Sequence, residues 1–131
     1  MIRLAVPACL LLAACTTTGD SGQADARDRA RLEKALAGLT PGAPMKCLRR
    51  DQANEIRTFE GTILYVAGRN RVWRNDVVGD CPGLRRGDIV VSKSFGSQNC
   101  SGDIIETRSP TGGMFSGSCS LGTFTPYTRQ E

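Results

Sequence analysis

Thr62-Ile63-Leu64-Tyr65-Val66-Ala67 is the stretch of this chain with the strongest preference for a β-strand. The run is β-branched and aromatic and contains neither proline nor glycine, which is typical of a strand. Gly68-Arg69-Asn70 follows as a turn signal, and Arg71 to Val77 resumes a strand-like pattern. The two segments therefore predict a β-hairpin near the middle of the chain.

Further strand-like segments lie on both sides of this hairpin. In chain order they are 55–60, 88–93, 103–107, 113–119 and 123–127. Turn residues recur about every eight to twelve residues, and no long helical period interrupts the pattern. The sequence therefore predicts an all-β fold, a small antiparallel β-barrel or sandwich over residues 47–131.

A short N-terminal helix is expected before the β domain, within residues 24–46. Residues 24–39 are rich in alanine and carry opposite charges at i,i+4 spacing. The leucines of this segment that fall on one face are Leu32, Leu36 and Leu39. Gly38 and Pro41 end the helix, and residues 40–46 are expected to form a linker. Two interpretations stay open: a solvated stalk or partly disordered linker, or a helix docked through its leucines on the domain or on a partner.

The start of the chain has the layout of an export signal. Arg3 precedes an apolar run that closes with Leu12-Ala13-Ala14-Cys15, and this run is shorter than the roughly 20 residues that span a bilayer as a helix. Its end is similar to a bacterial lipobox, in which the cysteine thiol receives a diacylglycerol. We therefore expect a lipoprotein signal peptide over residues 1–14, palmitate-type acylation at Cys15 and a flexible tether over residues 15–23. The alternative is an ordinary cleaved secretory signal.

These features predict a protein of the cell envelope, lipid-anchored and facing the periplasm, with the membrane as its first partner. Thr16 stands where an aspartate would favour retention in the inner membrane of many Gram-negative bacteria, so we favour the outer membrane. The formal net charge of +4 predicts mild attraction to anionic surfaces but no nucleic-acid binding.

Four cysteines remain within the β domain, and they are Cys47, Cys81, Cys100 and Cys119. A domain of about 80 residues is near the size at which a core alone can hold a fold. An even number of cysteines in a small exported domain indicates structural disulfides. Four cysteines allow three pairings, and we prefer Cys47–Cys119, which would tie the ends of the domain, with Cys81–Cys100, which would clip a strand pair.

Histidine is absent from the sequence, which excludes Ser-His-Asp and Cys-His catalysis and histidine-type zinc sites. Several carboxylates could supply the acid pair of a glycosidase, but each lies beside a turn or strand end, where aspartate commonly bonds to backbone amides. They are Asp76, Asp80, Asp88, Asp103 and Glu106. We therefore expect no enzyme, no metal and no cofactor.

The basic stretch 69–74 is the strongest candidate for binding. As a strand it places Arg71 and Trp73 on one face. Guanidinium hydrogen bonds and stacking on such a face can hold an anionic or sugar-bearing partner. Arg85 is expected to extend this patch. The alternative is a solvated sheet edge with Trp73 in the core.

Short motifs surround the cysteines and the hairpin. In order they are Cys47, Arg74-Asn75, Cys81-Pro82-Gly83-Leu84, Cys100 with Asp103-Ile104-Ile105, and Cys119-Ser120-Leu121-Gly122-Thr123-Phe124-Thr125-Pro126. Together they resemble a family of small bacterial cell-envelope proteins, a domain of unknown function. The chain departs from the family pattern at Ser101-Gly102 and in the longer segment 109–118. Because the family has no assigned activity, the resemblance implies the fold and the disulfides but no function.

The function expected from the sequence is that of a membrane-anchored envelope lipoprotein with a non-enzymatic binding or structural role. Its partner would be another envelope protein or an anionic glycan. The alternative is an inhibitor of a host or rival hydrolase that inserts the segment 109–118, because a rigid loop loses little entropy on binding.

Overall fold

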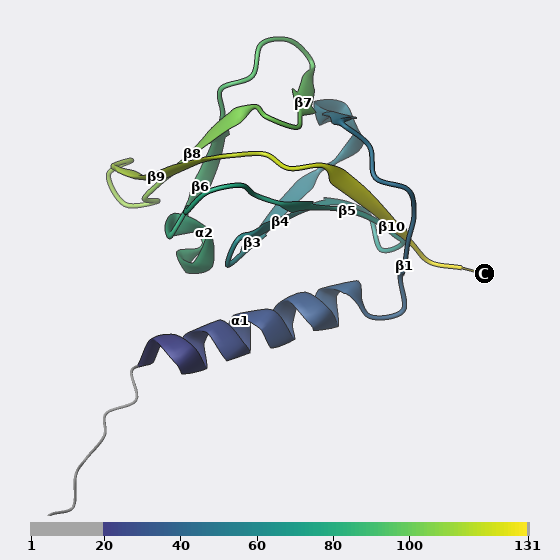
Figure 1. Cartoon of the computed structure of the whole chain (residues 1–131), viewed down its shortest axis with the longest axis horizontal. Helices are drawn as coiled ribbons and strands as arrows, with labels where there is room; N and C mark the ends of the chain where they lie inside the picture. The colour runs from purple at the N-terminus through teal and green to yellow at the C-terminus, as the bar shows by residue number, and fades with distance from the viewer. Residues whose placement is uncertain (1–19, 131) are drawn as a thin grey trace, which may run out of the picture.

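The computed structural model describes residues 20–130, which are mostly β, with one long helix and three antiparallel sheets (Figure 1). The expectations for the signal peptide, for Cys15 and for the start of the tether lie outside the described residues. Over residues 20–130 the three sheets do not join into one closed barrel. Within the same range, no helix has both the length and the apolar character needed to cross a membrane.

The elements in chain order are α1 (Asp20–Leu36), β1 (Thr40–Pro41), β2 (Cys47–Arg49), the 3-10 helix η1 (Arg50–Gln52), β3 (Glu55–Phe59), β4 (Thr62–Ala67), β5 (Arg71–Asp76), α2 (Gly83–Arg86), β6 (Ile89–Ser92), β7 (Gln98–Cys100), β8 (Ile104–Arg108), β9 (Phe115–Ser120) and β10 (Phe124–Thr128). The strands expected from the sequence match β3, β4, β5, β6, β8, β9 and β10 closely. The sequence pattern did not indicate β1, β2, β7 and α2, which are two to four residues long.

The largest sheet has the strand order β1-β10-β5-β4-β3. The predicted hairpin lies at its centre, where β4 and β5 pair from Ala67 and Arg71 to Thr62 and Asp76. The strand order of the second sheet is β6-β8-β9, and β2 and β7 form a two-stranded sheet.

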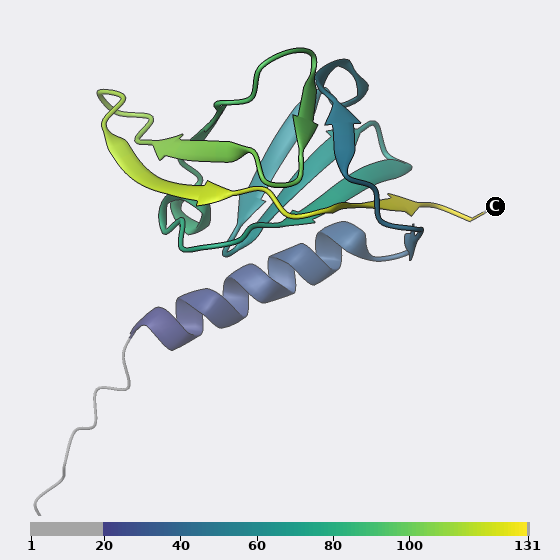
Figure 2. The same cartoon turned by 45° about the horizontal axis from the view of Figure 1, so that its top comes forward.

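The five-stranded sheet is buried on both faces (Figures 1 and 2). Because side chains alternate along a strand, Ile63 and Tyr65 of β4 enter the larger core, which the two smaller sheets cover. Leu64 faces the opposite side, where it packs with Phe59 and with Leu32 of α1. Because both faces of β4 are buried, its apolar residues follow one another and do not alternate with polar ones.

Helix α1 is docked on the domain, so the described part of the helix is not a solvated stalk. It begins at Asp20 and ends at Leu36, a few residues earlier at each end than expected. Leu32 is only 9% exposed, and Leu36 and Leu39 pack beside it. The expected linker 40–46 also takes part in the sheet, because β1 pairs with β10.

Two disulfides are present, as predicted, but the preferred pairing is wrong. The structure joins Cys47 to Cys100 and Cys81 to Cys119. The antiparallel register of β2 and β7 sets Cys47 directly opposite Cys100. A backbone bridge between the segment before Cys81 and β9 brings the second pair together. Both contacts depend on short strands or isolated bridges that leave no periodic pattern in the sequence.

The motif residues around the cysteines hold the fold together. The buried Asn75 side chain donates to the carbonyl oxygen of Gly122 at 2.8 Å and accepts from the amide of Gly122 at 2.9 Å. A Cβ on Gly122 would overlap the backbone carbonyl of Asp76. A Cβ on Gly83 would come within 2.8 Å of the side-chain oxygens of three residues, Thr107, Ser116 and Asp88. These glycines are therefore required for close packing.

Candidate functional site

An open groove lies between two edge strands of the protein. β3 is the last strand of the five-stranded sheet, and β6 is the last strand of the three-stranded sheet. Two hollows of about 360 and 270 Å³ lie between these strands and share Ile56 and Val90 in their linings. We call the combined feature the β3–β6 groove. Its main apolar residues are Leu48, Ala53, Ile56, Tyr65, Ile89 and Val90.

The two edges of the groove have the chemistry of strands that can accept another strand. Each edge strand has a sheet neighbour on one side only, so it presents backbone N–H and C=O groups on the other. Ile56 on β3 is 49% exposed, and Ile89 on β6 is 53% exposed. Apolar side chains beside free backbone groups favour contact with an extended polypeptide.

A network of neutral oxygens fixes one cation at the side of the groove. Nε of Arg50 donates to Oδ1 of Asn99 at 3.1 Å, and Nη2 of Arg50 donates to the carbonyl and hydroxyl oxygens of Ser94, both at 2.9 Å. The hydroxyls of Ser92 and Ser94 also donate to Oδ1 of Asn99 at 3.0 Å. Within residues 20–130, all acceptors of the Arg50 side chain are neutral. Its full positive charge is therefore available to a ligand.

The larger hollow is lined by two arginines, Arg49 and Arg50, and by no carboxylate. Arg49 pairs with the exposed Asp51, which lies outside the lining. Burial raises the pKa of Tyr65 to about 12, so this phenol in the lining is neutral at physiological pH. The arrangement suits a ligand that buries apolar groups and brings a carboxylate to Arg50.

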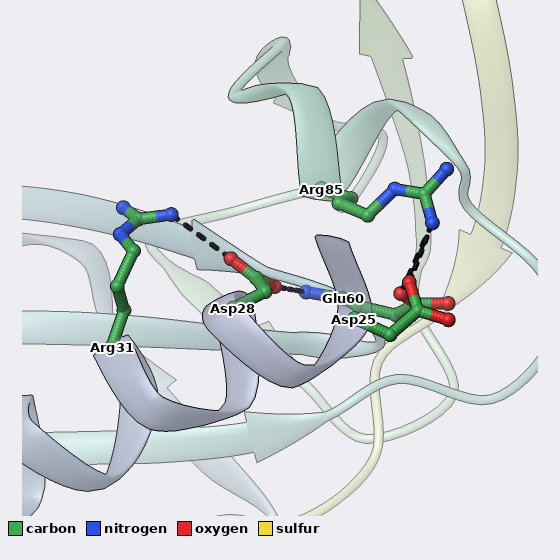
Figure 3. Close-up of polar contacts among 5 residues, drawn as sticks. All are labelled: Asp25, Asp28, Arg31, Glu60 and Arg85. Carbon is green, nitrogen blue, oxygen red and sulfur yellow. Dashed lines mark hydrogen bonds and ion pairs between the residues drawn. The ribbon is translucent and has the colours of Figure 1, made fainter. Parts of the chain in front are cut away.

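A second polar cluster joins α1 to the sheet and to α2 (Figure 3). Nη1 of Arg85 on α2 lies 2.6 Å from the Asp25 carboxylate and 3.5 Å from that of Glu60. Asp28 accepts a hydrogen bond from Arg31 at 2.9 Å and another from the backbone N–H of Glu60. We call these five residues the helix clamp, because they connect the N-terminal half of α1 to the β3–β4 turn.

The two neighbouring carboxyls of the helix clamp, Asp25 and Glu60, have pKa values shifted in opposite directions. Hydrogen bonds with Glu60 and with Arg85 hold the pKa of Asp25 below its ordinary value. The pKa of Glu60 is raised, first by its hydrogen bond with Asp25 and then by burial. Asp25 therefore ionises at a lower pH than Glu60, and its carboxylate is the one that lies closer to Arg85.

The predicted binding patch of Arg71, Trp73 and Arg85 is not formed. Trp73 is 4% exposed and belongs to the larger core, and the Arg71 guanidinium lies 5.8 Å from its ring centroid. Arg71 pairs with Ala67 at one end of the hairpin, whereas Arg85 contacts Glu60 beyond the other end. Strands of six residues separate these ends by about 17 Å at 3.3–3.4 Å per residue. Trp73 lies in the core, as the alternative interpretation expected, but β5 is an inner strand between β10 and β4 and not a solvated sheet edge.

Most of the carboxylates considered for catalysis have structural partners. Asp76 accepts from the Thr62 hydroxyl and from Arg74, and Asp103 accepts from the amide of Cys100. Glu106 pairs with Arg108 and Lys93. A hydrogen bond from Ser116, together with Arg86, holds the pKa of Asp88 below its ordinary value. In the part of the chain that the structure covers, no three histidine, cysteine or acidic residues gather as metal ligands.

Sequence reasoning missed the residues that form the groove. Arg50 lies in a three-residue helix, and Asn99 lies in a three-residue strand, so neither belongs to a recognisable period. The available signal was Ile56, an apolar residue between the charged residues Glu55 and Arg57 on a predicted strand. Its exposure depends on β3 being an edge strand, which the sequence does not state.

Comparison with known proteins identifies no relative of this chain. No family model matches the chain, and no curated protein and no solved structure is similar to it. The resemblance to a family of small envelope proteins therefore stays a prediction.

Proposed function

We propose that this protein is a lipid-anchored protein of the cell envelope, with the outer membrane favoured, that binds another envelope protein and catalyses no reaction. The β3–β6 groove would hold an extended segment of that partner. The observation that carries the proposal is a groove between two edge strands, with an apolar lining and with Arg50 fixed among neutral oxygens. The anchor rests on the Cys15 sequence motif.

Binding would occur by addition of a strand to an exposed sheet edge. Backbone hydrogen bonds supply affinity in this mode, and pockets for alternate side chains supply specificity. One side chain of the bound segment would rest on Ile56 and Val90, and a carboxylate would meet Arg50. We also propose that the three sheets together behave as an open sandwich, with the groove as its open side.

A rigid groove makes this binding more favourable. The Cys47–Cys100 disulfide joins β2 to β7, the two strands that supply Leu48 and Asn99 to the lining. A surface that is already ordered loses little conformational entropy when a ligand binds. The groove can therefore recognise a flexible segment, although that segment itself must become ordered.

The test is selection of peptides from a random library on the immobilised protein, followed by calorimetry with the enriched peptides. We expect enriched sequences to alternate apolar residues and to carry an acidic residue. Arg50→Gln should weaken binding about tenfold or more, because it removes a charged hydrogen-bond partner. Arg57→Gln is the matched control, because this arginine lies on the opposite face of β3 from Ile56, and it should leave affinity unchanged. Absence of enrichment, or equal loss in both variants, would contradict the proposal.

The anchor is tested separately by mass spectrometry of the native protein. We expect a chain that begins at an acylated Cys15 and lacks residues 1–14. A chain that retains an unmodified Cys15 would contradict the lipid anchor, and it would leave the peptide-binding proposal standing.

The β8–β9 hairpin supports the second candidate function, inhibition of a hydrolase. Its tip exposes Met114 (72%) and Phe115 (58%). Two backbone hydrogen bonds of Ser109 stabilise the tip. The amide of Ser109 donates to the Met114 carbonyl at 2.8 Å, and the carbonyl of Ser109 accepts from the amide of Gly113 at 3.1 Å. A rigid tip with exposed apolar side chains suits insertion into an active-site cleft. Inhibition by the protein in a hydrolase panel, abolished by Phe115→Ala, would support this function, and no inhibition would remove it.

A further inference from the structure

A hollow of about 490 Å³ lies between the C-terminal half of α1 and the loop of the β4–β5 hairpin. Five of its lining residues are basic, and they are Arg31, Lys34, Arg57, Arg69 and Arg129. The other lining residues are apolar ones from α1 and the turn that follows it. We call this hollow the basic pocket. Its lining includes no carboxylate.

Two of the five cations already have an acidic neighbour. Arg31 pairs with Asp28 at 2.9 Å, and Arg57 approaches Glu55 at 3.8 Å. Among the side chains that the structure describes, those of residues 22–130, no ion pair involves Lys34, Arg69 or Arg129. The pocket therefore gathers like charges that are only partly compensated within the described part of the chain. Such a gathering is unfavourable unless solvent or an anion screens it.

Three separate segments bring these cations together. Lys34 is on the last turn of α1, Arg69 is in the hairpin loop, and Arg129 follows β10. The amide of Arg129 donates to the carbonyl of Asn70 at 3.2 Å, which joins the end of the chain to the hairpin loop. Figure 1 shows the C-terminal end of α1 beside β1 and the end of β10. The arrangement is thus built by the tertiary fold rather than by a run of basic residues.

We infer that the basic pocket binds the phosphate groups of anionic membrane lipids. Lysine and arginine both bind phosphate, and arginine can do so through two parallel hydrogen bonds. The C-terminal end of a helix carries partial negative charge, so the anion is held by the side chains and not by α1 itself. The choice of a bilayer as the source of the phosphate rests on the proposed function.

The position of α1 supports a lipid surface as the source. Four residues separate Cys15 from the first residue of α1, and an extended chain of that length spans less than about 20 Å. The helix is docked and is about 25 Å long. A lipid on Cys15 would therefore keep the first residue of α1 within about 20 Å of the bilayer and the basic pocket, near the other end of the helix, within about 45 Å. A helix that lies along the bilayer would bring the basic pocket to the headgroups. Attraction of about 1 kcal/mol for each basic residue near an anionic leaflet corresponds to about fivefold for each residue.

The experiment measures partition of the full chain carrying Cys15→Ser, which cannot be acylated, into vesicles. One set of vesicles is phosphatidylcholine alone, and the other contains about one third phosphatidylglycerol. We expect stronger partition into the anionic vesicles, reduced by high salt. The triple variant Lys34→Ala, Arg69→Ala, Arg129→Ala should lose roughly 100-fold of this preference. The leader carries Arg3 and therefore adds to the preference for anionic vesicles in every variant. Because all variants keep the same leader, the differences between them report the substituted residues.

A second triple variant controls for net charge. Lys46→Ala, Arg86→Ala and Lys93→Ala remove the same charge outside the basic pocket. This variant should keep most of the preference for anionic vesicles. Equal loss in both triple variants, or no preference in the parent chain, would overturn the inference. Displacement by millimolar inorganic phosphate at constant ionic strength would assign the pocket to free phosphate and would also overturn it. Neither result depends on peptide binding in the groove or on acylation of the native protein.

Discussion

The two faces of the five-stranded sheet are covered in different ways. One face packs against the smaller sheets and α2 in a core of ten buried residues, which both disulfides reinforce. The other face packs against α1 in a core of four buried residues, and the helix clamp adds polar contacts. The cross-linked side carries the β3–β6 groove, and the helix side carries the basic pocket.

This difference indicates that the two candidate sites depend on different interactions. Structural units with few buried apolar contacts open at a lower free energy than the rest of the protein. Helix α1 fits that description, so its release should disrupt the basic pocket and leave the groove intact. The following predictions test this comparison, from the largest expected effect to the smallest.

Among these four predictions, loss of the Cys81–Cys119 disulfide should have the largest effect on stability. This bridge closes a segment of 38 residues, and loop closure of that length corresponds to about 4 kcal/mol. The double variant Cys81→Ser, Cys119→Ser should lose about this amount in urea unfolding followed by Trp73 fluorescence. A loss under about 1 kcal/mol would contradict the view that this bridge is essential to the cross-linked side.

Gly122→Ala should destabilise the protein by about 3 kcal/mol, because the new Cβ overlaps the carbonyl of Asp76 and disturbs the Asn75 hydrogen bonds. Gly22→Ala is the matched control, since no heavy atom lies within 4 Å of its added Cβ. Thermal unfolding of both variants checks the prediction. Similar melting temperatures in the two variants would contradict the close approach at Gly122.

Leu32→Ala should cost about 2–3 kcal/mol, mostly as release of α1 and not as global unfolding. Limited trypsin cleavage within α1 should accelerate, because the helix carries several arginines. Peptide affinity of the groove should stay unchanged, whereas partition into anionic vesicles should fall. If peptide binding were lost when the helix is released, the two faces of the sheet would be coupled.

The pH dependence of the helix clamp should be the smallest effect. The pKa of Asp25 is lowered in the folded protein, so its ionised carboxylate contributes to the free energy of unfolding. This contribution is complete above the ordinary aspartate pKa of about 4, and it is lost as pH falls through the lowered pKa. The pKa of Glu60 is raised, so the contribution of Glu60 to stability has the opposite pH dependence and is lost as pH rises through the raised pKa. Carboxyl titration by NMR should therefore place Asp25 below Glu60. The reverse order would contradict the ion pair between Asp25 and Arg85.

The predictability of the fold from the sequence differs between its long and its short elements. β4 and β5 were predictable because six residues of consistent composition and a glycine-containing turn define each of them locally. The disulfide pairing was not predictable from the sequence, because the strands that set Cys47 opposite Cys100 are only three residues long. Docking of α1 was one of two open interpretations, and the unbroken apolar run Ile63 to Val66 was the unused sign that both faces of β4 are covered.

The candidate sites were less predictable than the fold. The patch expected from Arg71 and Arg85 failed because these two arginines lie at opposite ends of the hairpin and Trp73 is buried. The groove and the basic pocket instead combine residues from segments far apart in the sequence, such as Arg50 with Asn99 and Lys34 with Arg129. Single-sequence patterns report local order, and they do not report which segments the tertiary fold brings together.

Native-state hydrogen exchange of the full chain, with the disulfides intact and increasing urea, tests most directly whether the two faces are independent. The account predicts that amides of α1 exchange through a local opening, with a lower free energy and a smaller urea dependence than amides of β4, β5 and β8. Identical free energies and urea dependences for α1 and these strands would show a single cooperative unit and would contradict it.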